Sequence, residues 1–212
     1  MRGRFITLEG GEGAGKSTQA RRLVEALRAR GLEVVQTREP GGSPGAEDLR
    51  ALLLQGGTER WSPLCEALLM YAARSDHLDR VIRPALERGA WVVCDRFADS
   101  TRAYQGAGGG VPPEVVEQLD RAVVGRDQPH LTLIFDMPVE AGLERAKSRD
   151  GSHDRFESKG REFHQRLRER FLAIAEADPD RCVLVDALGA PDEVARRVWS
   201  AVEARLLESV GG

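Results

Sequence analysis

The feature that most constrains the fold is a glycine-rich segment at residues 10–17, which reads Gly-Gly-Glu-Gly-Ala-Gly-Lys-Ser. A run of branched aliphatic residues precedes it and a helical pattern follows it. In this context the spacing G-x-x-x-x-G-K-[ST] forms a phosphate-binding loop (P-loop). Glycines let the backbone curl so that its N–H groups point at phosphate oxygens, and the N-terminus of the next helix adds partial positive charge. The segment therefore predicts a strand, a loop and a helix that bind a nucleoside triphosphate.

Short runs rich in branched aliphatic residues alternate with stretches of helical pattern along the chain. Such alternation is typical of βαβ units and predicts a three-layer α/β fold with helices on both faces of a parallel sheet. Ligands bind beyond the carboxyl ends of the strands in such sheets, and three runs end in a carboxylate, Glu9, Asp95 or Asp136. The predicted strands are residues 5–9, 33–37, 91–95, 131–136 and 181–186.

Helical patterns fill most of the intervals between these runs. A long helix is expected to bend or break near Pro84, because proline lacks the N–H group that a helix interior needs. Residues 106–113 are rich in glycine and proline and predict a loop. The predicted helices are residues 16–30, 63–88, 113–124 and 191–207.

Residues 139–170 carry a helical pattern that a polar turn at 150–154 interrupts. Basic residues flank the turn on both sides, among them Arg149 and Arg155. Two helices joined by a basic loop predict a movable lid, which we place at about residues 142–158.

The overall charge argues against a large nucleic-acid-binding surface, because 31 Lys and Arg face 34 Asp and Glu, a balance of −3. No apolar run reaches the length of a membrane span, and no signal-peptide core follows Met1. Cys65, Cys94 and Cys182 are widely spaced and predict buried, reduced thiols. We expect a single cytoplasmic domain over residues 1–212 without nucleic-acid or membrane partners.

Two side chains of the P-loop suit particular parts of a nucleoside triphosphate. Lys16 can bridge the β- and γ-phosphates, and the Ser17 hydroxyl suits Mg²⁺, which prefers oxygen ligands. The residues expected to bind the triphosphate are Gly10, Gly11, Glu12, Gly13, Ala14, Gly15, Lys16, Ser17 and Thr18.

Two arginines, Arg38 and Arg96, follow the second and third predicted strands and should face the same crevice. A planar guanidinium can hold two phosphate oxygens at once, so the pair predicts a receptor for a second phosphate beside the P-loop. Glu39 and Asp95 could orient these arginines or hold metal-bound water, and Asp95 joins Ser17 as a candidate metal residue.

Five segments in order resemble the motifs of the thymidylate kinase family, and the resemblance covers essentially the whole chain. It implies a P-loop kinase fold with a five-stranded parallel sheet of order 2-3-1-4-5 and a helical lid. It also implies transfer of the ATP γ-phosphoryl group to dTMP with Mg²⁺, and a homodimer. The segments are Phe5-Ile6-Thr7-Leu8-Glu9-Gly10 with the P-loop, Thr37-Arg38-Glu39-Pro40-Gly41-Gly42, Tyr71-Ala72-Ala73-Arg74, Asp95-Arg96-Phe97 and Ser100-Thr101-Arg102-Ala103-Tyr104-Gln105-Gly106.

The resemblance also implies an acceptor site. Arg38 and Arg96 match arginines that bind the monophosphate, and Arg74 matches one that hydrogen-bonds thymine. Glu12 would touch the acceptor sugar or the water shell of the metal. The residues implied on the base or sugar side are Ser100, Gln105 and, near the 2′ face of the sugar, Tyr104.

Two positions depart from the family pattern. Met70 stands where family members usually place a phenylalanine that stacks on the base, although a thioether can still pack against an aromatic face. Gly13 stands where some members carry a P-loop arginine, so a lid arginine should compensate the transition-state charge, Arg149 first and Arg155 in reserve. The expected catalytic residues are Lys16, Arg149, Arg96 and Glu12.

Two other readings stay open at this stage. Another nucleoside monophosphate kinase or a deoxynucleoside kinase would share this architecture, but a deoxynucleoside would not need both Arg38 and Arg96. A GTP-dependent switch would need an N-K-x-D segment after a strand, and the sequence holds none.

Overall fold

A computed structural model describes residues 2–57, 59–147, 156 and 159–207. Its strands form one parallel sheet of order β2-β3-β1-β4-β5, which confirms the predicted order. Each predicted strand is within about one residue of the observed one. The strands are β1 (Phe5–Gly10), β2 (Val34–Arg38), β3 (Trp91–Asp95), β4 (Leu131–Asp136) and β5 (Cys182–Asp186).

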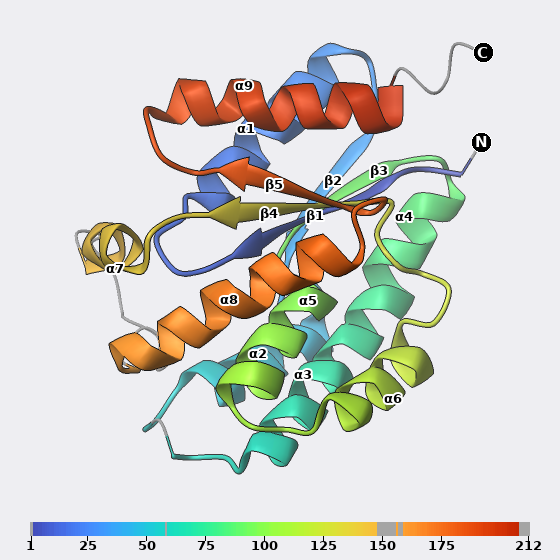
Figure 1. Ribbon diagram of the computed structural model, residues 1–212. Coiled ribbons are helices and arrows are strands. Elements are labelled where there is room, and N and C mark those ends of the chain that lie inside the picture. Colours follow the sequence, from blue (N-terminus) through green and yellow to red (C-terminus); the bar gives the residue numbers. More distant parts are fainter. Residues whose placement is uncertain (1, 58, 148–155, 157–158, 208–212) are drawn as a thin grey trace.

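Helices connect the strands and cover both faces of the sheet (Figure 1). Three short π-helical segments continue or join α-helices. The α-helices are α1 (Lys16–Ala29), α2 (Pro44–Leu54), α3 (Pro63–His77), α4 (Arg83–Glu87), α5 (Ala98–Thr101), α6 (Pro113–Val123), α7 (Val139–Lys147), α8 (Arg161–Ala177) and α9 (Pro191–Val202). The π-helical segments are η1 (Leu78–Ile82), η2 (Arg102–Gly108) and η3 (Glu203–Leu207).

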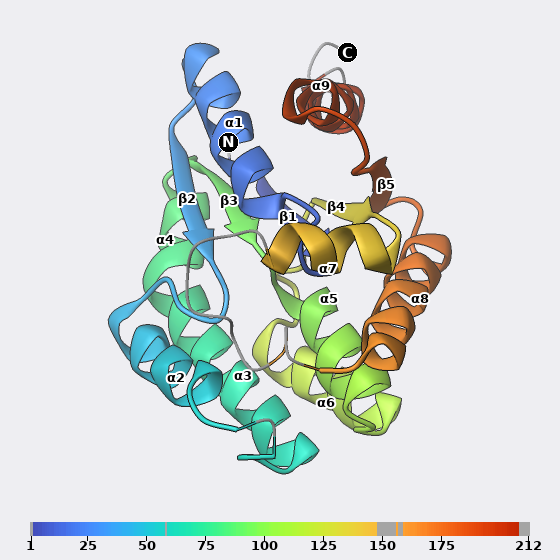
Figure 2. The same ribbon diagram turned by 90° about the vertical axis from the view of Figure 1, so that its left-hand side faces the viewer.

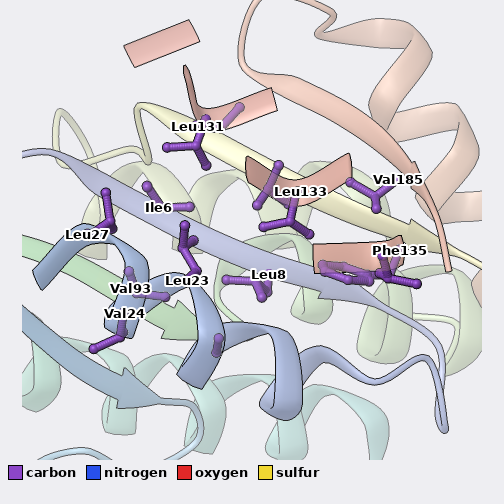
Figure 3. Close-up of a cluster of buried hydrophobic side chains, with 14 of the residues drawn as sticks. Ile6, Leu8, Leu23, Val24, Leu27, Val93, Leu131, Leu133, Phe135 and Val185 are labelled. Carbon is purple, nitrogen blue, oxygen red and sulfur yellow. The ribbon is translucent and has the colours of Figure 1, made fainter. Parts of the chain in front are cut away.

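Helices α1 and α9 cover one face of the sheet (Figure 1). Buried side chains of α1, such as Leu23 and Leu27, pack against Ile6 and Leu8 of β1 and Leu133 of β4 (Figure 3). These aliphatic residues recur at helical spacing on α1 and point inward from the strands, so burying them fixes the helix that begins at the P-loop onto the central strand.

The opposite face is covered by α3, α4, α5, α6 and α8. Phe5, Val92 and Cys94 of the sheet pack there with Tyr71 of α3, whereas Phe171 of α8 belongs to a neighbouring cluster. Figure 2 looks at the carboxyl ends of the strands, with α7 in front of β1 and β4. The site lies at this edge because the loops after β1, β2 and β3 meet here.

The predicted long helix over 63–88 exists as α3, η1 and α4 in succession. The π-helical segment η1 directly precedes α4. Pro84 lies in the first turn of α4, where its missing N–H is tolerated. The predicted bend therefore takes the form of a widened turn. None of the described helices is long and apolar enough to cross a membrane.

The predicted loop at residues 106–113 is wrong in its first part, since η2 continues to Gly108. A Cβ at Gly108 would lie 2.6 Å from the Phe163 ring, so this glycine lets α8 pack closely against η2. Sequence patterns also missed α2 and ended α8 too early. Of the predicted lid at 142–158, residues 142–147 belong to α7, residue 156 is also described, and residues 148–155, 157 and 158 lie outside the described part.

Candidate functional site

The P-loop joins β1 to α1, as its motif predicts. Gly13 has a φ of 70°, and a Cβ there would lie 1.9 Å from the carbonyl oxygen of Gly142 on α7. Glycine is therefore required at this position for two reasons, the left-handed backbone and the close approach of α7. The loop is held against the first residues of the predicted lid.

Lys16 is buried at the start of α1, and its Nζ donates to the carbonyl oxygen of Gly11 at 2.7 Å. Burial, together with the nearby positive charge of Arg96, lowers the pKa of Lys16 from 10.5 to about 8. Ser17 donates a hydrogen bond to the carboxylate of Asp95 at the end of β3. The two predicted metal residues thus lie side by side.

A cavity of about 900 Å³ opens above the P-loop. Its walls combine the loop, the ends of β2 and β3, and one arginine from each of α2 and α7. The residues around it are Glu12, Gly13, Gly15, Lys16, Ser17, Thr18, Arg38, Glu39, Arg50, Asp95, Arg96 and Arg145. The high density of cations suits a cavity for phosphate groups.

A second cavity of about 540 Å³ adjoins the first, and the two share Glu12, Glu39, Arg50 and Arg96. The second cavity gathers nearly all the predicted acceptor residues. Those that line it are Glu12, Met70, Arg74, Arg96, Ser100, Tyr104 and Gln105. Arg38 instead lines the first cavity, the one above the P-loop.

Arg96 lies where the two cavities meet and is held from several sides. Its Nη2 donates to Glu12 Oε1 at 2.7 Å and to the Tyr104 hydroxyl at 2.9 Å. Its Nη1 donates to the carbonyl oxygen of Gly10 at 3.1 Å and to Ser100 Oγ at 3.2 Å. Burial alone would lower the pKa of this guanidinium, but Glu12 and other neighbouring groups more than offset burial and raise it. The φ of 69° is unusual for a residue other than glycine and marks a locally strained backbone.

Arg74 projects from α3 into the second cavity and is almost fully buried, with 2 % of its side chain exposed. Its Nε donates to Glu39 Oε2 at 2.8 Å, and its Nη2 donates to Phe97 O and Thr101 Oγ1, each at 3.0 Å. Its Nη1 has no hydrogen-bond partner among the described residues. A buried cation with one unused donor beside a cavity is suited to a ligand oxygen.

Sequence reasoning left two roles open for Glu39 and Asp95, orienting Arg38 and Arg96 or holding metal-bound water. Among the described residues, the two arginines donate to other acids. Arg38 donates to Glu47 at 3.1 Å, and Arg96 to Glu12. Glu39 instead holds Arg74. The reason is tertiary, because α2 brings Glu47 beside Arg38 and α3 brings Arg74 beside Glu39.

Glu9, at the end of β1, is a buried acid to which sequence reasoning assigned no role. Its carboxylate accepts from the Phe97 amide at 2.7 Å and from Ser100 Oγ at 2.5 Å. Burial, followed by repulsion from Asp99, raises the pKa of Glu9 from 4.5 to about 7. Its position at a strand end was the signal that could have found it.

Other cavity residues were missed because they come from elements or contacts that the sequence did not reveal. Arg50 and Leu54 belong to α2, and Pro44 at the first turn of α2 was an available helix-start signal. The Phe156 ring lies edge-on to Tyr104, with ring centroids 5.6 Å apart, and it too lines the second cavity. Met70 packs against the apolar cluster that contains Tyr104 and Phe156.

The two candidate lid arginines, Arg149 and Arg155, lie outside the described residues. Within α7, Arg145 reaches the phosphate cavity and donates to the carbonyl oxygen of Ala187 at 3.3 Å.

Comparisons with known proteins agree with this geometry. The sequence model of the thymidylate kinase family matches residues 8–198. The chain is similar to a thymidylate kinase from Caulobacter vibrioides, with 59% identity over 96% of this chain and 98% of the other. A thymidylate kinase from Bradyrhizobium diazoefficiens is 55% identical over 97% of this chain and 91% of its own. The crystal structure of thymidylate kinase from Ehrlichia chaffeensis superposes with a TM-score of 0.77 at 33% identity, covering 95% of this chain and 99% of the other.

Proposed function

The chain belongs to the thymidylate kinase family, which phosphorylates dTMP to dTDP with ATP, and we propose that its residues divide this work between the two adjoining cavities. The observation that carries the assignment is Arg74, a buried arginine with an unused Nη1 among the described residues, which lines a cavity that shares Arg96 with the cavity above the P-loop. One nucleotide would present its phosphates to the P-loop, and the other would place its base beside Arg74.

The P-loop, residues 10–17, and the next residue, Thr18, bind the phosphates of ATP in this proposal. Backbone N–H groups surround the β-phosphate, and Lys16 turns from its internal carbonyl contact to the β- and γ-phosphate oxygens. Since the pKa of Lys16 is only about 8 when no phosphate is bound, the arriving anion also stabilises the charged form of the lysine.

Ser17 and Asp95 are the residues we propose for Mg²⁺. Their side chains meet at the edge of the P-loop cavity and offer a hydroxyl and a carboxylate oxygen, a donor set that fits this ion. When bound with ATP, the ion would neutralise phosphate charge during transfer. The protein's part is to hold these two oxygens together, one from the first turn of α1 and the other from the end of β3.

The acceptor dTMP occupies the second cavity. Arg96 and Arg38 face its phosphate, and Arg74 donates Nη1 to an oxygen of the thymine ring. Met70 provides an apolar wall against the base. The residues proposed for the remaining base and sugar contacts are Ser100, Tyr104 and Gln105, with Glu12 near the sugar.

Transfer then needs little proton chemistry, because the attacking group is already an anionic phosphate oxygen. That oxygen forms a bond to the γ-phosphorus as the bond to the bridging oxygen of ADP breaks. Lys16 and Arg96 stabilise the charge on the transferring group, and Glu12 holds Arg96 in place. The lid arginine Arg149 stays our prediction for the third cation, with Arg155 in reserve.

We further propose that residues 1–212 form one kinase domain with its lid, that it works in the cytoplasm where ATP is plentiful, and that it forms a homodimer. Leu64 and Leu68 on α3 and Leu52 on α2 are large apolar side chains left exposed, which supports a partner on this face. Sedimentation of the protein, compared with a Leu68→Glu variant, tests the dimer.

An ADP-release assay tests the proposed function with ATP and Mg²⁺ and a panel of acceptors: dTMP, dUMP, UMP, dCMP, dGMP and thymidine. We expect clear preference for dTMP. Preference for another monophosphate would keep the P-loop chemistry but contradict the base assignment of Arg74. Activity on thymidine alone would contradict the phosphate assignments of Arg38 and Arg96.

A further inference from the structure

His77 lies behind the second cavity, which we call the acceptor cavity from here on. It has no part in the function proposed above. It is the last residue of α3, three residues after Arg74, and its side chain is fully buried, with 0 % exposed. Its Nδ1 lies 2.9 Å from Glu39 Oε1, and its Nε2 lies 2.7 Å from Thr37 Oγ1. Both ring nitrogens therefore join α3 to the end of β2.

Glu39 connects His77 to Arg74. One carboxylate oxygen accepts from Arg74 Nε at 2.8 Å, and the other faces His77. A carboxylate held at one oxygen alone can still turn about its last bond. Held at both oxygens by side chains of one helix, it fixes the plane and direction of the guanidinium.

His77 also braces the segment that carries Arg38. Thr37 directly precedes Arg38, and a Cβ built at Gly42 would lie 2.4 Å from both His77 Nε2 and Thr37 Oγ1. The backbone at Gly42 thus lies close to the Nε2 side of the ring, with no room for a side chain between them. The Gly42 amide donates at 2.9 Å to Glu47, the acid that also pairs with Arg38. His77 therefore meets both ends of residues 37–42.

We propose that His77 is a positioning residue for the acceptor, which sets the spacing between Arg74 at the base and Arg38 at the phosphate through its contact with Glu39. This inference rests on the proposed function, in which these two arginines hold the two ends of dTMP. Residues 10–18 take no part in the named contacts of His77. Affinity for dTMP should therefore depend on His77, and affinity for ATP should not.

Two substitutions separate the contacts of the ring. In His77→Asn the amide nitrogen can take the place of Nδ1 and keep the bond to Glu39, whereas in His77→Gln it can take the place of Nε2 and keep only the bond to Thr37. Calorimetric titration with dTMP and, separately, with ATP gives both affinities. We expect His77→Gln to raise the Kd for dTMP about tenfold, the effect of losing one charge-assisted buried bond. His77→Asn should stay within about twofold of wild type, and neither variant should change the Kd for ATP.

Three results would overturn the inference: wild-type dTMP affinity in His77→Gln, an equal loss of dTMP affinity in both variants, or an equal loss of dTMP and ATP affinity. The last would mean that His77 is only structural. The matched control is His130→Gln, which should bind dTMP normally. His130 directly precedes β4, and its Nδ1 accepts from the Phe5 amide at the amino end of β1, whereas the site lies at the carboxyl ends of the strands.

If His77→Gln does not fold, Thr37→Val and His77→Asn carry the test, because both keep the Glu39 contact. Each should bind dTMP within about twofold of wild type, and a tenfold loss in either with normal ATP binding overturns the inference. Failure of the proposed function is separate, since it would appear as absent dTMP phosphorylation by the wild-type enzyme.

Discussion

The two cavities are built by different means. About half of the residues that line the P-loop cavity come from one continuous segment, residues 12–18, and the buried cation of that segment, Lys16, donates to a backbone carbonyl oxygen. The acceptor cavity collects side chains from α2, α3, η2 and the strand ends. Two of its arginines pair with carboxylates, Arg74 with Glu39 and Arg96 with Glu12.

The two cavities differ in how far their basic side chains are charged and fixed in place before an anion binds. Arg74 and Arg96 of the acceptor cavity are charged and held by their acids before substrate arrives, so their geometry is set in advance. Among the described residues, Lys16 forms no such ion pair. Because its pKa is lowered, part of its charge is gained only when phosphate binds.

Arg96→Lys should lower kcat/KM for dTMP by about 10³-fold, because a lysine cannot reach the acceptor phosphate, Glu12 and Tyr104 together. Steady-state kinetics measure the loss. The matched control is Arg102→Lys, another largely buried arginine paired with acids, which faces α6. It should lose stability but keep kcat/KM within about twofold, so equal losses in the two variants would remove Arg96 from the chemistry.

Lys16→Met should weaken ATP binding by about 100-fold, as expected when a charge-assisted contact to phosphate is lost. The proton balance is the sharper test. Lys16 loses its proton as pH rises through about 8 in the free protein, so ATP binding at pH 8.5 should take up protons. Calorimetry in two buffers of different ionisation enthalpy measures this uptake. Undiminished uptake in Lys16→Met would assign it to another group.

Glu9→Gln should change how stability depends on pH. The folded protein holds a proton on Glu9 up to about pH 7, whereas the unfolded chain loses it near 4.5. Stability therefore falls as pH rises through this window, and the variant lacks this fall. The change from 4.5 to about 7 corresponds to roughly 3 kcal/mol. Urea unfolding at pH 4.5 and 8 should show the variant gaining relative to wild type; parallel curves would contradict the raised pKa.

Met70→Ala should raise the KM for dTMP about fivefold, the loss expected when an apolar side chain no longer packs against the base. The KM for ATP should not change. Leu68→Ala is the matched control, because Leu68 lies on the same helix with 48 % of its surface exposed. A rise in KM with Leu68→Ala as large as that with Met70→Ala would show that the effect comes from the helix rather than the cavity.

The sequence could predict more of the P-loop cavity than of the acceptor cavity. The strands, their order and the P-loop follow from local patterns and a family resemblance, and the structure confirms them within a residue or so. The pairing of Arg74 with Glu39 joins residues 35 positions apart and depends on how α3 packs beside β2. No local pattern encodes that contact.

Two other features were not predicted from the sequence, again because they depend on contacts between separate elements. Phe156 lines the acceptor cavity and packs on Tyr104, a residue 52 positions earlier in the chain. The helical conformation at Gly106–Gly108 runs against the low helix propensity of glycine, and tertiary packing of η2 against α8 overrides that propensity. Residues whose roles arise from packing between elements were the ones that sequence reasoning missed.

The most direct test of the account is a set of four calorimetric titrations, with dTMP and ATP each titrated into Lys16→Met and Arg74→Gln. We predict a crossed result. Lys16→Met should lose ATP binding and keep its affinity for dTMP within about twofold, and Arg74→Gln should lose dTMP binding and keep its affinity for ATP. Unchanged dTMP affinity in Arg74→Gln, or loss of both ligands in either folded variant, would contradict the assignment of one nucleotide to each cavity.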